Sequence, residues 1–147
     1  MLEDVLGFYM KISSAATSTL VGSAFYPLRL PQKPPMPAIT YARVGSLREP
    51  THGGPTGFVE ARIQFSCYAK TFDKAREIRS AVRDDLDGFK GIMPGLDDAT
   101  VQIDGAFFED EGDGIDDELD CFVSRVDITF QYQEVLPETL ARPPADR

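Results

Sequence analysis

Residues Val59 to Lys70 read VEARIQFSCYAK, and apolar residues alternate with polar ones along this stretch. Successive side chains of a β-strand point to opposite faces of its sheet, so this alternation predicts a strand with one buried face and one polar face. It is the clearest period-two signal in the chain. A sheet with one covered face is typical of antiparallel and mixed β-sheets.

A helix is predicted directly after this strand. Thr71 or Asp73 can cap its first turn. Gly88 and Gly91 are expected to end it. The mostly apolar stripe between these signals consists of Ile78, Ala81, Val82, Asp85, Leu86 and Phe89.

Before this strand and helix, the spacing of apolar residues predicts an N-terminal helix that starts near Leu2. A break or a second short helix is expected at Ser13 and Ser14. Further strands are expected at residues 25–28, 38–47, 99–108 and 119–134. The helices are too few to cover both faces of a sheet. The predicted fold class is therefore α+β, with a mixed or antiparallel β-sheet of four to five strands and two to three helices packed on one face.

Proline and glycine mark the connections. Four prolines in residues 31–37 predict a stiff crossover. Residues 48–57 hold three glycines and two prolines, which predicts a mobile hairpin loop. After Pro137 the chain is polar and rich in proline. We expect a single domain over residues 1–136 and a flexible tail over residues 137–147.

The chain is strongly acidic. Among its 147 residues, 24 are Asp or Glu and 15 are Lys or Arg, which gives a net charge of −9. Specific binding to nucleic acid or to an anionic membrane is therefore disfavoured. The acidic N-terminus differs from a secretory signal, and no stretch is apolar enough to span a bilayer, so a soluble intracellular chain is expected. Cys67 and Cys121 match no metal spacing and are expected to be free, buried thiols.

No arrangement of residues points to catalysis. The only histidine, His52, lies in the Gly/Pro-rich segment, which would not fix its position for general base chemistry. Nucleotide, zinc-protease and serine-hydrolase motifs are missing from the sequence. We therefore expect no enzymatic activity, no cofactor and no metal.

Residues 109–120 form an acidic stretch with one competing interpretation. The acids fall at positions 1, 3, 5 and 12 of an EF-hand loop and a glycine falls at position 6. Strand patterns flank this stretch where an EF-hand has helices. We therefore expect a solvated acidic hairpin tip, with a Ca²⁺-binding module or a partner-binding surface as the alternatives.

The order of these signals resembles the phage tail terminator family, whose members are also called tail completion or tail-to-head joining proteins. The likeness covers residues 6–132. It rests on the order of the elements and on five short strings, which are Leu20-Val21-Gly22, Pro37-Ala38-Ile39-Thr40-Tyr41, Arg62-Ile63-Gln64-Phe65-Ser66-Cys67-Tyr68-Ala69, Ala75-Arg76-Glu77-Ile78 and Arg125-Val126-Asp127-Ile128-Thr129-Phe130.

This resemblance implies a structural ring protein, typically a hexamer, at the head-proximal end of a tail tube. Such a ring ends tube polymerisation, joins the tail to the head and lets DNA pass through its lumen without specific binding. The implied partners are further copies of the chain, the tail tube protein and a neck or head-completion protein. The implied location is the virion, after assembly in the host cytoplasm. The alternative in the same setting is another neck component, a head-completion or stopper protein bound to the portal.

Two segments are the predicted contact surfaces: the Gly/Pro-rich loop over residues 48–57 and the acidic turn over residues 109–120. Long polar loops on a rigid scaffold often carry binding. The acids of residues 97–120 are expected to line or rim the channel and to repel the phosphates of passing DNA. The same acidic turn could meet Arg43, Arg62 or Arg83 of an adjacent copy. The individual candidates are Arg48, Glu49, Thr51, His52, Gly53, Gly54 and Thr56 in the first segment, and Glu109, Glu111, Asp113, Asp116 and Asp117 in the second.

Overall fold

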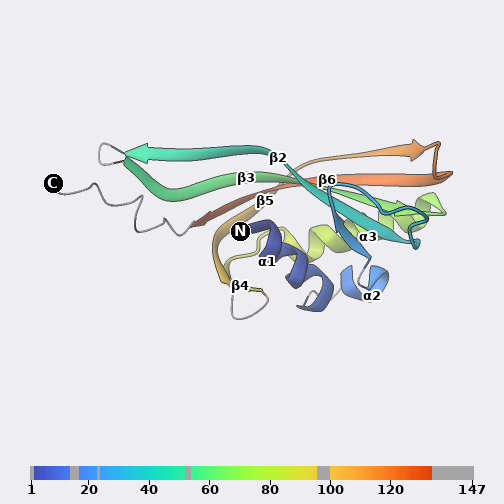
Figure 1. Cartoon of the computed structure of the whole chain (residues 1–147), viewed down its shortest axis with the longest axis horizontal. Helices are drawn as coiled ribbons and strands as arrows, with labels where there is room; N and C mark the ends of the chain where they lie inside the picture. The colour runs from blue at the N-terminus through green and yellow to red at the C-terminus, as the bar shows by residue number, and fades with distance from the viewer. Residues whose placement is uncertain (1, 14–16, 23, 52–53, 96–99, 134–147) are drawn as a thin grey trace.

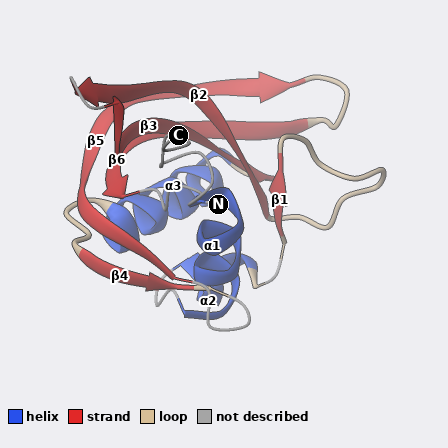
Figure 2. Cartoon of the chain, turned by 60° about the vertical axis from the view of Figure 1, so that its left-hand side comes forward, coloured by secondary structure: helices blue, strands red, loops and turns tan. Residues whose placement is uncertain are grey.

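The computed structural model describes residues 2–13, 17–22, 24–51, 54–95 and 100–133. A curled β-sheet wraps around the helices, which all lie on its concave side (Figures 1 and 2). The elements follow in the order α1 (Leu2–Phe8), the π-helix η1 (Tyr9–Ser13), α2 (Thr17–Val21), β1 (Phe25–Pro27), β2 (Ala38–Thr51), β3 (Gly54–Ala69), α3 (Phe72–Leu86), β4 (Gly91–Pro94), β5 (Thr100–Asp116) and β6 (Cys121–Gln133).

The sheet has six strands in the order β1-β2-β3-β6-β5-β4. β1 runs parallel to β2, and the other neighbouring strands are antiparallel. The predicted α+β class with a mixed sheet is thereby confirmed, but the expected four to five strands are too few. The missed strand is β4, which lies at the sheet edge and carries few strand signals, because it begins with Gly91 and ends with Pro94.

The alternation that predicts β3 is confirmed residue by residue. Its apolar side chains, such as Ile63 and Phe65, are buried against the helices, while the polar side chains between them lie on the outer face. Phe25 of β1 stacks on Tyr41 of β2, with 4.5 Å between the ring centroids. Cys67 is a free, buried thiol as expected, and burial raises its pKa far above the usual range. Because the helices cover only the concave face of the sheet, its outer face remains available for contacts (Figures 1 and 2).

The predicted limits of α3 are also confirmed. Thr71 is the N-cap, and its side-chain oxygen accepts a hydrogen bond from the backbone N–H of Lys74 at 3.2 Å. The helix ends at Leu86, and Gly88 follows with φ +83°, a conformation that favours glycine. A capped helix of this length packs firmly on β3 and β6.

Residues 48–51 and 54–57 belong to strands, where the glycines and prolines predict a hairpin loop. β2 continues to Thr51 and β3 begins at Gly54, so the two strands remain paired almost to the hairpin tip. Pro50 lies opposite Pro55 and Thr51 opposite Gly54, while His52 and Gly53 are outside the described residues. Pairing that starts in the core overrides the local turn signals here, and a register shift between Arg48 and Pro50 accommodates the prolines.

The acidic stretch is also more regular than expected. β5 does not end near Phe108 but continues to Asp116, and a turn over residues 117–120 leads into β6. The strand is hidden in the sequence because its side chains beyond Phe108 are mostly acidic or glycine, so the period-two alternation disappears. The predicted flexible tail at residues 137–147 lies outside the described residues.

Candidate functional site

Two long β-hairpins project from opposite ends of the sheet and form the candidate assembly surface (Figure 1). One hairpin consists of the distal parts of β2 and β3, and the other consists of the distal parts of β5 and β6. The first carries the candidates Arg48, Glu49 and Thr51 on β2 and Gly54 and Thr56 on β3. The second carries the acidic candidates. The structure therefore places the two candidate groups far apart on one molecule.

The acidic candidates lie along a strand instead of converging on one point. Glu109, Glu111, Asp113 and Asp116 belong to β5, and Asp117 begins the turn. Asp116 shapes this turn, because its Oδ1 accepts a hydrogen bond from the backbone N–H of Leu119 at 3.0 Å. Strands flank the stretch on both sides, which differs from the two helices of an EF-hand. Nowhere in the described ranges do three His, Cys, Asp or Glu side chains group as a metal ion would need.

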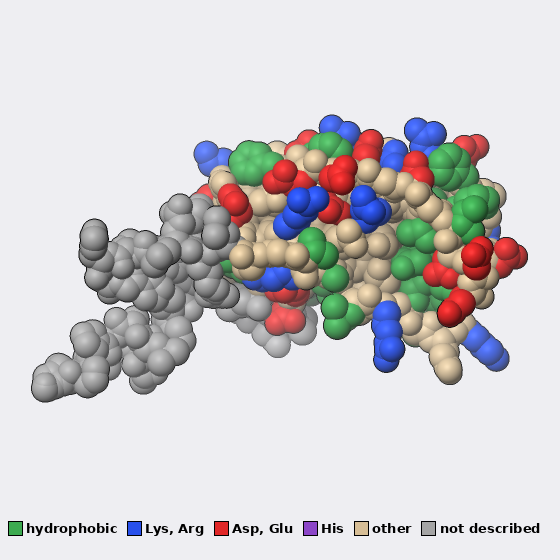
Figure 3. Space-filling view, turned by 90° about the horizontal axis from the view of Figure 1, so that it is seen from above, with side chains coloured by type: hydrophobic (Ala, Val, Ile, Leu, Met, Phe, Trp, Pro, Cys, Tyr) green, Lys and Arg blue, Asp and Glu red, His purple; other side chains and the backbone are tan. Residues whose placement is uncertain are grey.

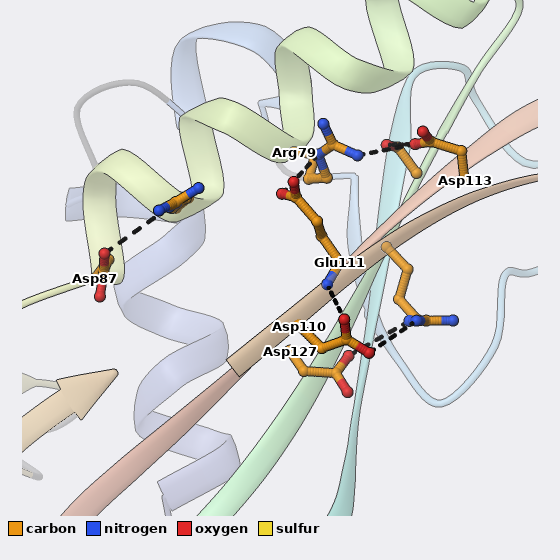
Figure 4. Close-up of polar contacts among 9 residues, drawn as sticks. Arg79, Asp87, Asp110, Glu111, Asp113 and Asp127 are labelled. Atoms are coloured by element: carbon orange, nitrogen blue, oxygen red, sulfur yellow. Dashed lines mark hydrogen bonds and ion pairs between the residues drawn. The ribbon is translucent and has the colours of Figure 1, made fainter. Parts of the chain in front are cut away.

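A buried arginine of α3 holds the acidic hairpin against the helix layer (Figure 4). Arg79 Nη1 donates a hydrogen bond to Asp113 Oδ1 at 2.9 Å, and Arg79 Nε lies 3.5 Å from Glu111 Oε1. Ser124 Oγ of β6 donates to the same Asp113 oxygen at 2.5 Å. Arg79 is only 8 % exposed. This contact fixes two predicted interaction residues within their own chain.

Sequence reasoning missed Arg79 as a functional residue. Its position on the helix is a signal that could have found it. Arg79 lies four residues after Ala75 and next to Ile78, and both of these residues are buried, so Arg79 lies on the apolar side of the helix. A cation at that place on an apolar stripe needs an anionic partner from the packed layer. The acidic residues of β5 supply it.

A second cluster lies on the outer face of the sheet, around Asp127 of β6. This carboxylate is 4 % exposed and accepts hydrogen bonds from Arg62 Nε at 3.0 Å and Nη2 at 2.8 Å. Arg125 Nε lies 3.5 Å from the other oxygen of Asp127, and Arg125 Nη2 lies 3.6 Å from Asp110 Oδ2. The two arginines thus connect β3, β6 and β5 across the outer face. Figure 3 shows acidic and basic side chains interspersed over this face.

The three arginines that we expected to meet the acidic turn of another copy already have partners in their own chain. Arg43 of β2 binds Glu3 of α1 at 2.9 Å. Arg62 binds Asp127 at 2.8 Å, and Arg83 lies 3.8 Å from Asp87. An intermolecular role for them would require the exchange of these partners. The acidic hairpin instead uses Arg79 and Arg125 within the chain.

The outer face is hollowed beside the acidic hairpin. An open groove of about 560 Å³ runs along β5, where Gly112 and Gly114 place no side chain on the outer face. At Gly112 the space is partly filled, since an added Cβ would lie 3.0 Å from Nη2 of Arg125, whereas an added Cβ at Gly114 would meet nothing within 4 Å. The hairpin tip is therefore thin and open to a neighbouring molecule.

In the part of the chain that the structure describes, no helix is both long enough and apolar enough to cross a membrane.

Comparisons with known proteins give a family match and a similar fold. The sequence model of a family described as "Tail completion protein gp17" matches residues 12–133. No curated protein matches the chain. Among solved structures, a chain of the "Virion of native gene transfer agent (GTA) particle" has a similar fold, with a TM-score of 0.64 and 16 % sequence identity. That alignment covers 88 % of this chain and 93 % of the other.

Proposed function

The chain belongs to the tail completion protein gp17 family, and we propose that it forms a ring that caps the head-proximal end of a phage or phage-like tail tube. Family membership makes it a structural component of the virion tail. In the proposed role, the ring ends tube polymerisation and joins the tail to the head. The family match over residues 12–133 is the observation that carries this proposal, because it includes nearly every described element.

In this proposal the ring is built from copies of one chain, six in the simplest case. A protein that must contact the tube on one side, the neck on the other and its own copies laterally needs several separate surfaces. The two hairpins and the outer face of the sheet supply such surfaces at different places on the molecule (Figure 1). The role proposed for them is architectural and not catalytic.

The acidic hairpin is proposed to lie at the rim of the channel. Its tip carries Asp116, Asp117, Glu118 and Asp120, and Asp117 and Glu118 are exposed. A channel wall with excess negative charge repels DNA phosphates, so that DNA passes without adhering. The β2–β3 hairpin, with Arg48, Glu49, Thr51, Gly54 and Thr56, is proposed to contact the tube or a neighbouring copy.

The proposal is tested by locating the chain in the particle. Purified particles and tails without heads would be labelled with an antibody against this chain and imaged by electron microscopy. A single label at the head-proximal end of every tail is expected. Label along the whole tube would contradict the proposal, and label on heads that lack tails would instead support a head-completion or stopper protein.

A further inference from the structure

We propose that neighbouring copies join by strand pairing, in which the free edge of β2 in one copy binds the free edge of β5 in the next. This inference rests on the proposed ring and names the backbone segments that close it. The segments are residues 42–51 of β2 and residues 109–116 of β5.

The β2 edge is open because β1 is too short to cover it. β1 pairs with Ile39, Thr40 and Tyr41, and the backbone N–H of Leu28 then donates to the carbonyl of Tyr41 at 2.9 Å. From residue 42 to residue 51, no described strand pairs with β2 on the side away from β3. A hollow of about 430 Å³ begins beside this edge, lined in part by Pro27 and Ala42. The unpaired backbone therefore starts where β1 ends.

The β5 edge is open for the same reason. β4 covers β5 only as far as Ile103. The turn after α3 occupies the next part, where Gly88 N–H donates to the carbonyl of Ala106 at 2.8 Å and Asp87 Oδ1 accepts from the N–H of Phe108 at 3.0 Å. From residue 109 to residue 116, no described strand lies on the side away from β6.

Charge decides which edges can meet. Residues 109–116 contain five acids and no base, so pairing β5 with β5 of another copy would place like charges opposite each other. Residues 42–51 contain Arg43, which is already paired with Glu3, together with Arg48 and Glu49, whose charges balance. Pairing β2 with β5 therefore avoids the repulsion that would oppose β5 pairing with another β5. The acids also protect a free β5 from pairing with itself before assembly.

Strand direction and offset agree with ring closure. The strands β2, β3, β6 and β5 alternate in direction, so the addition of β2 from another copy to β5 continues an antiparallel sheet. The pairing can be followed from β5 through β6 and β3 to β2. Asp113 of β5 then lies at the same height along the sheet as Ile39 of β2, and Ala106 of β5 lies at the same height as Ser46 of β2. The free segments are thus displaced along the strands by roughly 20 Å, at about 3.3 Å per residue. Such a stagger tilts the strands as a closed barrel requires.

Hydrogen exchange measured on free chains and on chains assembled on purified tails tests this inference. The amides of residues 42–51 and 109–116 are expected to exchange more slowly after assembly, while the central strands β3 and β6 change little. The tails could carry the ring while the amides of either edge exchange as fast as in the free chain. This result would overturn the strand pairing and leave the proposed ring intact. Tails that carry no ring of this chain would overturn the proposed function itself.

Disulfide formation identifies which edges meet. Gly45 and Gly114 lie on the outer face, and both accept a Cβ without a contact shorter than 4.0 Å. In assembled tails, chains with Gly45→Cys and Gly114→Cys, or with Gly45→Cys and Asp110→Cys, are expected to link into multimers upon oxidation. The matched control pairs Gln64→Cys of the central strand β3 with Gly114→Cys and is expected to stay unlinked. Linkage in the Gly114→Cys single variant would show β5 against β5 and contradict the inference.

Discussion

At the scale of single residues, Arg79 connects the acidic hairpin to α3. Its guanidinium is buried and contacts both Asp113 and Glu111. Arg79→Met keeps the apolar stem but leaves these acids without their cation. We expect the free energy of unfolding to fall by about 1.5–3 kcal/mol, the range for hydrogen bonds to charged groups, and not by more, because both acids remain partly open to water. Urea denaturation of the isolated chain measures this loss.

Lys74→Met provides the control for this comparison. Lys74 pairs with Glu77 at 3.4 Å on the exposed side of the same helix. A surface pair of this kind contributes roughly 0–1 kcal/mol. Equal losses in the two variants would mean that the buried contacts of Arg79 add nothing to stability.

Glu3 makes stability depend on pH. Burial is the largest single effect and acts to raise the pKa of Glu3, but the hydrogen bonds and charge of Arg43, together with a backbone hydrogen bond, outweigh it, so the pKa is lowered. A lowered pKa in the folded state stabilises the protein at pH values above the ordinary carboxyl pKa of about 4.3. This contribution is lost as the pH falls through the lowered value.

Glu3→Gln is therefore expected to be less stable than the natural chain at pH 7, and the difference should narrow progressively below about pH 4.3. Urea denaturation at pH 7, 5 and 3.5 measures the difference. Arg43→Met should remove the same pH dependence, because it deletes the other partner of the pair. A stability difference that stays constant over this range would show that the charge of Glu3 is not involved.

At the scale of elements, the cap of α3 is a local signal with a local energy. Thr71→Ala removes the oxygen that accepts from the N–H of Lys74. We expect a loss of about 1 kcal/mol in the free energy of unfolding, since this is the usual value for an N-cap. Thr71→Ser keeps the hydroxyl and should lose much less in the same thermal or urea unfolding experiment. Equal destabilisation by both variants would point to the methyl group of Thr71.

Elements whose signals are local could be predicted from the sequence. The alternation along β3 and the stripe and cap of α3 each depend on neighbours in the chain, and both match the structure. The distal part of β5 could not be predicted, because its pairing partner lies in β6 and its own residues are acids and glycines. β2 likewise extends past Pro50 through its pairing with β3. Strand extensions of this kind depend on pairing with residues far away in the sequence, so the local composition does not predict them.

The candidate site was predictable in outline only. The sequence predicts an acidic surface over residues 109–120, but it does not predict the partners Arg79 and Arg125, since those lie on other elements. The arginines that we expected to be free for a neighbour, such as Arg43, are paired inside the chain. Partner choice depends on which side chains the packed layers bring within reach.

At the scale of the whole molecule, the acids placed at the tip of the β5–β6 hairpin are proposed to serve the passage of DNA. Asp117→Lys with Glu118→Lys reverses the charge at the exposed hairpin tip. We expect particles with normal tail length but reduced DNA delivery, because phosphates would adhere to the new cations. Electron microscopy measures tail length, and a transfer or infection assay measures delivery.

A matched pair on α3, Glu77→Lys with Asp84→Lys, makes the same charge change at exposed positions away from the tip. It is expected to leave delivery unchanged. Equal loss in both variants would mean that net charge, and not the placement of acids at the channel, matters.

Deletion of the gene tests the central claim most directly. Particles produced without this chain would be imaged and their tail lengths measured. If the chain caps the tube, tails of excessive and variable length without heads are expected, and expression of the natural chain should restore normal particles. Tails of normal length beside unjoined heads, or intact particles, would contradict the claim that this chain ends tube growth.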